Sequence, residues 1–471
     1  MASQSAIAEG GSIVSADAIN YQQKMFSHPS YKFEPQFPNT FGQPINLTAS
    51  RTPVTINLPP EVMNLSRSYL LYTVTLPTAG ATQYTWTPQD TLSEISQIQF
   101  YAGSNMLMVD VDNLQNYLNI VLKKETSNDE FQTMDAINRL YPSNSLVNVV
   151  PALRNSNDTS ATSVGGPANP SAVNYIEPAY WSVGALNGAV TYNVLFPLRL
   201  IKNTLFSIDK NLYFGQTTYL KLYFGPLSKI AYTSTSNANP SAGTKISYAP
   251  AAGNATISGT LQLMLAVESN QDLRTNLIQK VSGEGISCLI PFVQAFKNSN
   301  QGTAQNISIQ LDQNNGRSLM KVIHALYNNF EDQDTMYDHA NLLVPGVMTQ
   351  KVQQYYTQLN GKRNQDIQID CTPATGQFLD YMSHKRQLRG SVINNLNVYQ
   401  QNWFHCDDFS DFGPHYDQDN HGELISGIPM SVAPLTWSFV GVVLKNATFQ
   451  HYSWFVFVKK LTASPGTVIV Q

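Results

Sequence analysis

The sequence predicts an all-β protein made of two tandem β-sandwiches, and three observations lead to this prediction. Most of the 471 residues fall into short apolar or alternating runs separated by Pro, Gly, Asn and Asp, which is the spacing of strands in a sandwich. A chain of this length is long for one domain and sufficient for two. Four blocks of the first half also recur in the same order in the second half, so a duplicated domain is expected.

The first repeated block is a strand followed by a second apolar run. The strand Val54–Leu58 and the run that ends at Leu76 are matched by Ile307–Leu311 and the run that ends at Leu326. The two strands begin 307 − 54 = 253 positions apart. The block therefore predicts two neighbouring strands in each half.

The second block is a hairpin pattern, and the third is a short helical pattern directly after it. The hairpin Ile95–Val111 is matched by Val352–Ile369, which turns at Asn360-Gly361, a strong signal for a short hairpin. The helical patterns Leu114–Leu122 and Phe378–Met382 follow. They are followed by the basic pairs Lys123-Lys124 and Lys385-Arg386, as a helix C-terminus favours.

The fourth block begins at a proline and ends in an aromatic strand. In the first half it comprises Leu195–Leu198 and Tyr219–Phe224, and in the second half Gly427–Met430 and Tyr452–Phe457. The separation of the copies is smaller here than in the earlier blocks, since the first half contains a longer excursion before this block. The two predicted domains are therefore unequal.

These blocks predict the domain organisation. We expect a flexible N-terminal arm at residues 1–35, a first sandwich at 36–268, a linking helix at 269–283 and a second sandwich at 284–471. The helix prediction rests on apolar residues at helical spacing, with Gly283 where a C-cap belongs.

Two long excursions interrupt the first sandwich. Asn155–Asn174 and Thr233–Thr256 are both dense in Ser, Thr, Asn, Pro and Gly. Loops of this length inside compact domains usually serve an external purpose, so we expect both to project from one end of the sandwich.

Composition excludes several classes of function. Charged residues make up 13% of the chain, the net charge is −4 and no Lys/Arg cluster occurs, which argues against direct nucleic-acid binding. The three cysteines are too few and too widely spaced for a disulfide scaffold. With no signal peptide and no apolar run long enough to span a membrane, we expect a protein made in the cytoplasm or nucleus and not secreted.

Catalytic motifs are not found, so the sequence predicts no enzyme and no cofactor. It contains no P-loop, no Gly-x-Ser-x-Gly elbow and no His-Glu-x-x-His pair. The densest group of reactive residues extends from His405-Cys-Asp-Asp408 to His421. In it, Asp417, Asp419 and His421 are weak metal-ligand candidates that begin like a calcium loop, but Ile428 stands at the twelfth position, where such a loop needs a glutamate. A solvated loop is the preferred interpretation of the whole group.

The remaining reactive residues have simpler explanations. The acidic stretch Glu331–Asp338 is interpreted as a charged loop between strands, and Cys371 and Cys406 as buried structural thiols. The aromatic runs Trp403-Phe404 and Trp454–Phe457 are interpreted as sheet core.

The repeated blocks resemble the double jelly-roll major capsid proteins of adenovirus, virophages and polinton-like viruses. The resemblance covers Val54–Leu122 with Ile307–Met382, and Leu195–Phe224 with Gly427–Phe457. It implies two eight-stranded jelly rolls, with the long loops forming outer towers. It also implies a homotrimer that acts as a pseudo-hexagonal capsomer in the icosahedral capsid of a DNA virus. Penton and minor capsid proteins are the further expected partners.

Two other functions remain open from the sequence. A receptor- or carbohydrate-binding sandwich of a virus fibre or spike would need exposed aromatics beside Asp and Asn, and Trp403–Asp419 is the only candidate segment. A sandwich hydrolase would use the group His405–His421. For the capsid function, Met1–Tyr31 and Thr462–Gln471 are the segments expected to reach neighbouring subunits or internal components.

Overall fold

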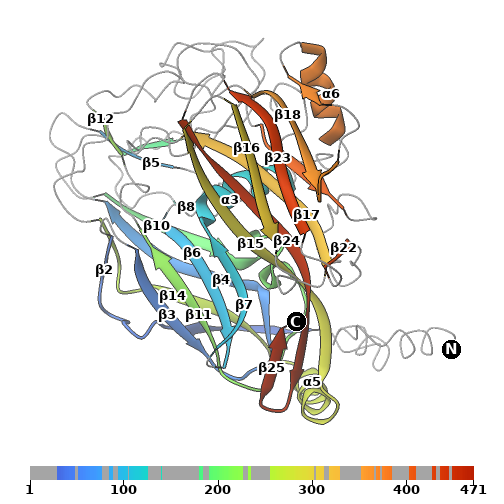
Figure 1. Ribbon diagram of the computed structural model, residues 1–471. Helices are drawn as coiled ribbons and strands as arrows, with labels where there is room; N and C mark the ends of the chain where they lie inside the picture. The colour runs from blue at the N-terminus through green and yellow to red at the C-terminus, as the bar shows by residue number, and fades with distance from the viewer. Residues whose placement is uncertain are drawn as a thin grey trace.

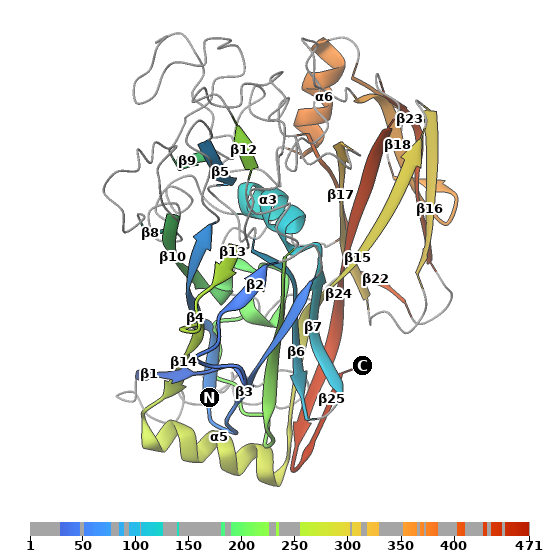
Figure 2. The same cartoon turned by 90° about the vertical axis from the view of Figure 1, so that its left-hand side faces the viewer.

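The structure, a computed structural model, places the two halves of the chain as two β-sandwiches side by side (Figure 1, Figure 2). The helix α5 (Gln271–Gly283) lies at one end of the molecule and α6 (Ala374–His384) at the other, while α3 (Leu114–Glu125) lies between the sandwiches. The residues that the structure describes are 29–47, 51–76, 84–88, 94–103, 105–125, 139–140, 180–183, 190–225, 232–234, 255–301, 304–311, 318–328, 352–364, 368–371, 374–384, 403–409, 427–430, 435–444 and 448–470.

The first sandwich consists of two antiparallel sheets. One has the order β1-β14-β4-β10-β8, with β13 beside β4 and β2 beside β13, and the other has the order β3-β11-β6-β7. The strands of the first sheet are β1 (Tyr31–Gln36), β14 (Gln262–Glu268), β4 (Met63–Leu76), β10 (Val190–Pro197), β8 (Arg139–Leu140), β2 (Ile45–Leu47) and β13 (Ala255–Ile257). Those of the second are β3 (Thr52–Leu58), β11 (Thr218–Phe224), β6 (Ile95–Ala102) and β7 (Met106–Asp112). The 3-10 turns η1 (Leu198–Leu200) and η2 (Leu205–Ser207) lie between β10 and β11.

The second sandwich repeats this plan. One sheet has the order β15-β24-β17-β21, with β22 beside β17 and β25 beside β24, and the other has the order β16-β23-β18-β19, with β20 beside β18. The strands of the first sheet are β15 (Ile286–Gln301), β24 (Thr448–Ser464), β17 (Ser318–Asn328), β21 (His405–Asp408), β22 (Ile428–Pro429) and β25 (Thr467–Val470). Those of the second are β16 (Ala304–Leu311), β23 (Leu435–Leu444), β18 (Val352–Leu359), β19 (Lys362–Arg363) and β20 (Ile369–Asp370).

Both sandwiches have jelly-roll topology. When the eight main strands of each sandwich are counted in chain order, one sheet has the order 1-8-3-6 and the other the order 2-7-4-5 in both halves. In both halves a helix, α3 or α6, follows the fifth strand. The predicted all-β fold of two tandem eight-stranded jelly rolls is therefore confirmed.

The fourth repeated block was matched incorrectly in its second part. Tyr219–Phe224 forms β11, the seventh strand of its sandwich, and its counterpart is β23, whereas Tyr452–Phe457 lies in β24, the eighth strand. Aromatic strands look alike in sequence, which explains the error. The first part holds, because Pro197 pairs with Tyr69 of β4 and Pro429 pairs with Ser318 of β17 in the same way.

Burial along the strands shows which faces form the core. In β11 alternate residues from Thr218 to Phe224 are buried, as expected for a strand with one face in the core. In β24, by contrast, every residue from His451 to Val458 is buried. One face, with Phe455 against Trp437, lies in the core of the second sandwich, and the other, with Trp454, faces the first sandwich. This strand is therefore shared between the two sandwiches.

A small three-stranded sheet, β12-β5-β9, joins three loops of the first sandwich. Its strands are β5 (Tyr84–Pro88), β9 (Tyr180–Val183) and β12 (Tyr232–Ser234), and they lie at the same end of the molecule as α6 (Figure 2). The excursion Asn155–Asn174 lies outside the described residues. Of Thr233–Thr256, only the two ends are described, in β12 and β13.

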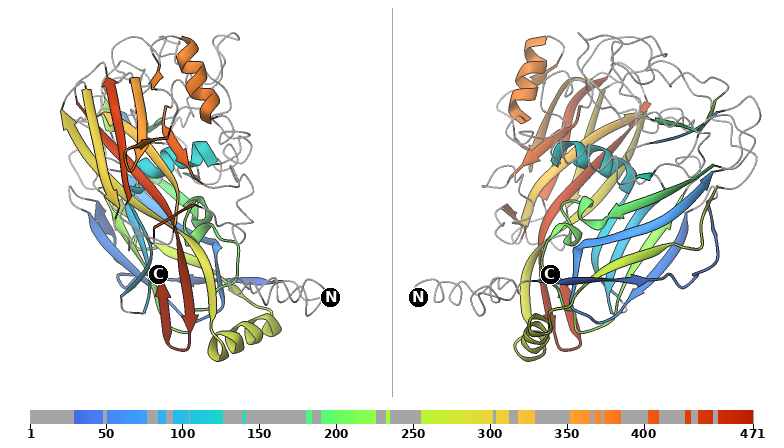
Figure 3. Two further views of the ribbon diagram at one scale, coloured as in Figure 1. Left: turned by 45° about the vertical axis from the view of Figure 1, so that its right-hand side comes forward. Right: turned by 180° about the vertical axis from the view of Figure 1, so that it is seen from behind.

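Three details of the chain ends and the linker differ from the prediction. Residues 31–35, assigned to a flexible arm, belong to β1, which pairs with β14. Thr462–Val470 forms a hairpin of β24 and β25 within the chain and does not extend away from it. The helix α5, seen end-on and lengthwise in Figures 1 to 3, is followed by Gly285 with φ 76°, so Gly285 and not Gly283 is its C-terminal glycine.

The close approach of β22 to β17 gives a first prediction. A Cβ at Gly427 would lie 2.6 Å from the Leu319 carbonyl oxygen, so Gly427→Ala should force the strands apart and reduce the stability by about 1–3 kcal/mol. Thermal unfolding measures this loss. Gly283→Ala is the matched control, since nothing lies within 4 Å of its added Cβ. Equal melting temperatures for the two variants would contradict the prediction.

Candidate functional site: the contact between the two sandwiches

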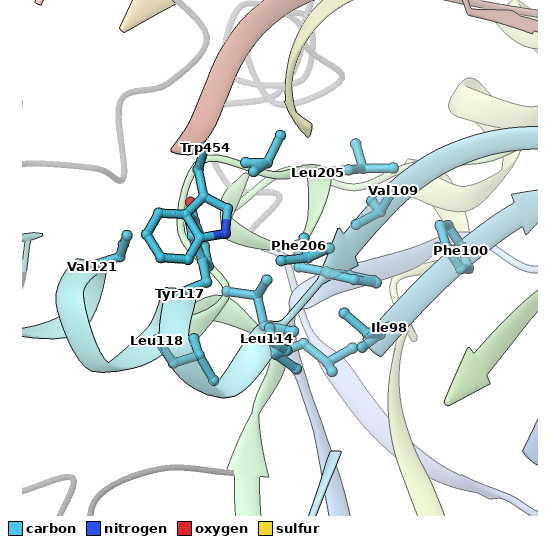
Figure 4. Packing of buried hydrophobic residues seen from close by; sticks show 14 of the residues in the cluster. Ile98, Phe100, Val109, Leu114, Tyr117, Leu118, Val121, Leu205, Phe206 and Trp454 are labelled. Atoms are coloured by element: carbon cyan, nitrogen blue, oxygen red, sulfur yellow. The ribbon is translucent and has the colours of Figure 1, made fainter. Parts of the chain in front are cut away.

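Helix α3 joins the sandwiches because both pack on it. The helix begins after Asn113, which has a φ of 53° and whose N–H donates a hydrogen bond to Asp112 Oδ1 at 2.9 Å. Figure 4 shows Leu114 of α3 beside Ile98 of the first sandwich and Tyr117 beside Trp454 of the second. The Tyr117 and Trp454 rings meet edge to face with centroids 5.6 Å apart. Helix α3 thus makes apolar contacts with both sandwiches.

A buried group of charged residues forms part of the same contact at the C-terminal end of α3. The Glu125 carboxylate accepts hydrogen bonds from Lys321 Nζ of β17 at 2.6 Å and from Asn203 Nδ2 at 3.0 Å. Lys124 Nζ lies 3.3 Å from the same Glu125 oxygen that accepts from Lys321. Asn203 Nδ2 also donates to Tyr117 Oη at 3.1 Å. The Glu125–Lys321 pair links the first sandwich to the second.

Burial and neighbouring charges have opposite effects on the pKa of the Glu125 carboxyl. Burial by itself would raise the pKa of Glu125, but the positive charges of Lys321 and Lys124 outweigh it and hold the pKa well below its usual range. Glu125 is therefore ionised at neutral pH, and neither lysine is left with an uncompensated buried charge. The group fixes how the two sandwiches meet.

This group was not predicted from the sequence. The pattern indicated Lys124 only as a residue that favours a helix C-terminus, and Lys321 was not singled out inside the run up to Leu326. A lysine in the middle of an apolar strand is the signal that was available, because such a residue is buried only when it has a partner.

Removal of the carboxylate gives a second prediction. Glu125→Ala should lower the free energy of unfolding by about 3–5 kcal/mol, since it leaves buried lysines without a counter-ion. Denaturant unfolding at neutral pH measures this. Arg51→Ala is the control: its pair with Asp112 is 39% and 40% exposed and should contribute less than about 1 kcal/mol. Similar losses in the two variants would refute the special role of Glu125.

A second buried polar group lies in the core of the second sandwich, around Asp407. One Asp407 oxygen accepts from Thr357 Oγ1 at 2.9 Å and lies 2.9 Å from His405 Nε2. The other accepts from Asn364 Nδ2 at 3.0 Å and from Trp437 Nε1 at 2.8 Å. Burial would raise the pKa of Asp407, but His405 and these donors lower it overall.

Asp380 of α6 forms a neighbouring network. It accepts hydrogen bonds from Tyr355 Oη and, at 3.0 Å, from Trp403 Nε1, with Cys371 Sγ 3.7 Å away. His384 Nδ1 lies 2.9 Å from the Asp380 carbonyl oxygen. The two networks meet where His405 Nδ1 lies 3.2 Å from Tyr355 Oη.

These networks correct one sequence interpretation. His405–Asp408 was interpreted as part of a solvated loop, but it forms β21, and His405, Cys406 and Asp407 are buried. Their partners come from distant parts of the chain, which sequence spacing does not reveal. Carboxylates that are buried and supplied with several donors stabilise a core.

The buried histidines give a third prediction, on pH. Burial lowers the pKa of His324 and His451, whose rings contact each other, and it lowers the pKa of His384 to about 4. His324 Nδ1 also lies 2.7 Å from Ser453 Oγ. Below pH 6.5 the unfolded chain therefore binds protons that the folded chain does not, so stability falls as the pH falls from about 6.5 to about 4. No loss arises from these histidines above pH 6.5.

His384→Gln tests this pH dependence. The variant should lose less stability than the unmodified chain between pH 7 and pH 5, by about 1–2 kcal/mol, because one titrating group is removed. Denaturant unfolding at several pH values gives the slope of the unfolding free energy against pH for each protein. Parallel slopes in variant and unmodified chain would show that His384 does not contribute.

The other candidate residues are placed as follows. The metal candidates Asp417, Asp419 and His421 and the acidic stretch Glu331–Asp338 lie outside the described residues. Within the described part of the chain, no group of three or more His, Cys, Asp and Glu could hold a metal ion. Cys371 and Cys406 are buried, as predicted, and burial raises the pKa of Cys406 to about 12, which keeps it a thiol.

No described helix has both the length and the apolar character needed to cross a bilayer.

No protein-family model and no curated protein sequence matches this chain. Solved structures do match it. A quasi-atomic model of the PBCV-1 virus capsid has a TM-score of 0.53 at 9% identity, over 95% of this chain and 99% of that one. The cryo-EM structure of the Sputnik virophage has a TM-score of 0.52 at 10% identity, over 94% of this chain and 88% of that one.

The likeness spans both sandwiches and not one alone, since it covers nearly the whole of this chain. At this level of identity it concerns the fold. The resemblance to double jelly-roll proteins that the repeated blocks predicted is therefore confirmed for the fold.

Proposed function

We propose that this chain is a major capsid protein that assembles as pseudo-hexameric homotrimers into the icosahedral shell of a DNA virus. The observation that carries the proposal is the pair of jelly rolls with identical strand order, held together by a buried contact. Three chains with two such units each supply six similar units, which fill a nearly hexagonal position in a lattice. The PBCV-1 capsid and the Sputnik virophage, whose structures match this fold, are viral particles.

The chemistry of the chain agrees with a structural role. With 13% charged residues, its surface is suited to contacts between subunits more than to isolated solubility. The reactive groups described in the second sandwich are buried and serve its core. The protein acts by self-assembly, without catalysis and without a cofactor.

Partners, location and domain limits belong to the same proposal. The chain contacts copies of itself first, and then penton and minor capsid proteins in the virion. It is made in the host cytoplasm or nucleus. The first jelly roll extends to residue 268, the linking segment comprises 269–283, and the second jelly roll begins at residue 284.

The alternative of a carbohydrate- or receptor-binding protein loses Trp403, the first aromatic residue of its candidate segment Trp403–Asp419, of which residues 410–419 lie outside the described part of the chain. Trp403 is fully buried and its Nε1 donates to Asp380. A sugar-binding aromatic side chain must instead present its face to solvent.

The proposal predicts a trimer in solution. Light scattering after size exclusion should give 3 × 52.2 = 156.6 kDa, and electron microscopy should show particles with a hexagonal outline. A stable monomer of 52.2 kDa at micromolar concentration would overturn the proposal.

A further inference from the structure

The helix α6 has one face in its own sandwich and one face in solvent. Gln377, Asp380 and His384 are buried against the second sandwich. The opposite face consists of residues at helical spacing, with Phe378 49%, Leu379 61% and Met382 41% exposed, flanked by the exposed Thr375 and Ser383. We call Phe378, Leu379 and Met382 the α6 face. It is apolar and carries no charge.

The first sandwich has an apolar outer sheet surface. In the sheet β1-β14-β4-β10, Leu71 pairs with Leu195, and Tyr69 pairs with both Pro197 and Met264. All five are partly exposed, while Leu70 and Tyr72, which alternate with them, are buried in the core. We call these five residues the outer face; Phe33 of β1, 45% exposed and 5.5 Å from the Tyr69 ring, extends it.

Each of these two surfaces has a counterpart in the other sandwich of the same chain. The two counterparts, helix α3 and the sheet β15-β24-β17-β21, are in contact with each other. Helix α3 holds the same position in the first sandwich as α6 in the second, since each follows the fifth strand. The sheet β15-β24-β17-β21 has the same strand order as β1-β14-β4-β10. Within the chain α3 packs on the outward side of that sheet, through Tyr117 on Trp454 and Glu125 on Lys321.

We infer that the α6 face docks on the outer face of the first sandwich of a second copy of this chain. The inference rests on the proposed function and deepens it, because it names the surfaces that hold the trimer together. Helix α3 of the first sandwich already lies on the sheet β15-β24-β17-β21 within one chain. Among the described elements, α6 and the sheet β1-β14-β4-β10 are therefore the corresponding pair for a neighbour. A contact of two different surfaces closes into a ring when the same rotation is repeated, and three copies complete it.

The contact between copies differs in character from the one within the chain. The internal contact includes the charged group of Glu125, Lys124 and Lys321. The α6 face has only apolar side chains to contribute, so its contact forms by burial of apolar surface alone. A single buried carboxylate at its centre would have no partner and would oppose the contact.

Leu379→Glu and Leu71→Glu, each made alone, test the inference. Both positions are on the surface of the free chain, so each variant should fold with an unchanged melting profile at low concentration. Light scattering should show that each dissociates to 52.2 kDa under conditions where the unmodified chain is a trimer, with association weakened at least about 100-fold. Ile469→Glu, at a 39% exposed apolar residue of β25 outside both surfaces, should remain a trimer.

A mixture of the two variants adds a test of which surface meets which. The Leu71→Glu chain keeps its α6 face and the Leu379→Glu chain keeps its outer face, so one intact contact forms and the mixture should contain a dimer of 2 × 52.2 = 104.4 kDa. If the unmodified chain is a monomer, the proposed function itself fails. If it is a trimer and either variant remains one, if Ile469→Glu dissociates equally, or if the mixture stays monomeric, this inference is wrong and the proposed function stands.

Discussion

The packing of β24 on both of its faces is the constraint on which the rest of the molecule depends. Phe455 belongs to the core of the second sandwich, while Trp454, one residue earlier, meets Tyr117 of α3. A shift of register by one residue would exchange the side chains on the two faces of this strand, so that each set would meet a core packed for the other. The angle between the two sandwiches is therefore determined by the same residues that form the core of one of them.

The sequence predicted the fold well because the information about it is local and periodic. Alternation in β3 and β11, the Asn360-Gly361 turn and the helical spacing after each hairpin all lie within short windows, and their repetition in order made the duplication visible. The error in the fourth block has the same origin, since alternation alone does not distinguish β23 from β24. Strand order depends on pairing between distant segments, which no short window contains.

The polar groups were harder to predict for a related reason. Glu125 and Lys321 are 196 residues apart, and Asp407 is satisfied by residues of β18, β23 and the turn after β19. In sequence, His405–Asp408 has the composition of an exposed loop, and only its partners make it a buried strand. The contact between the sandwiches and the core networks therefore had to be found in three dimensions.

The three-stranded sheet β12-β5-β9 has a consequence for how this protein can change over time. Its strands come from three different loops, and β5 in the middle pairs with both of the others. A change in one loop therefore affects the other two. An insertion within β5 would break its pairing with both neighbours, whereas an insertion beyond β9 or β12 would leave the sheet intact. The backbone pairing of β5 with its two neighbours therefore limits where insertions in these three loops can be accepted.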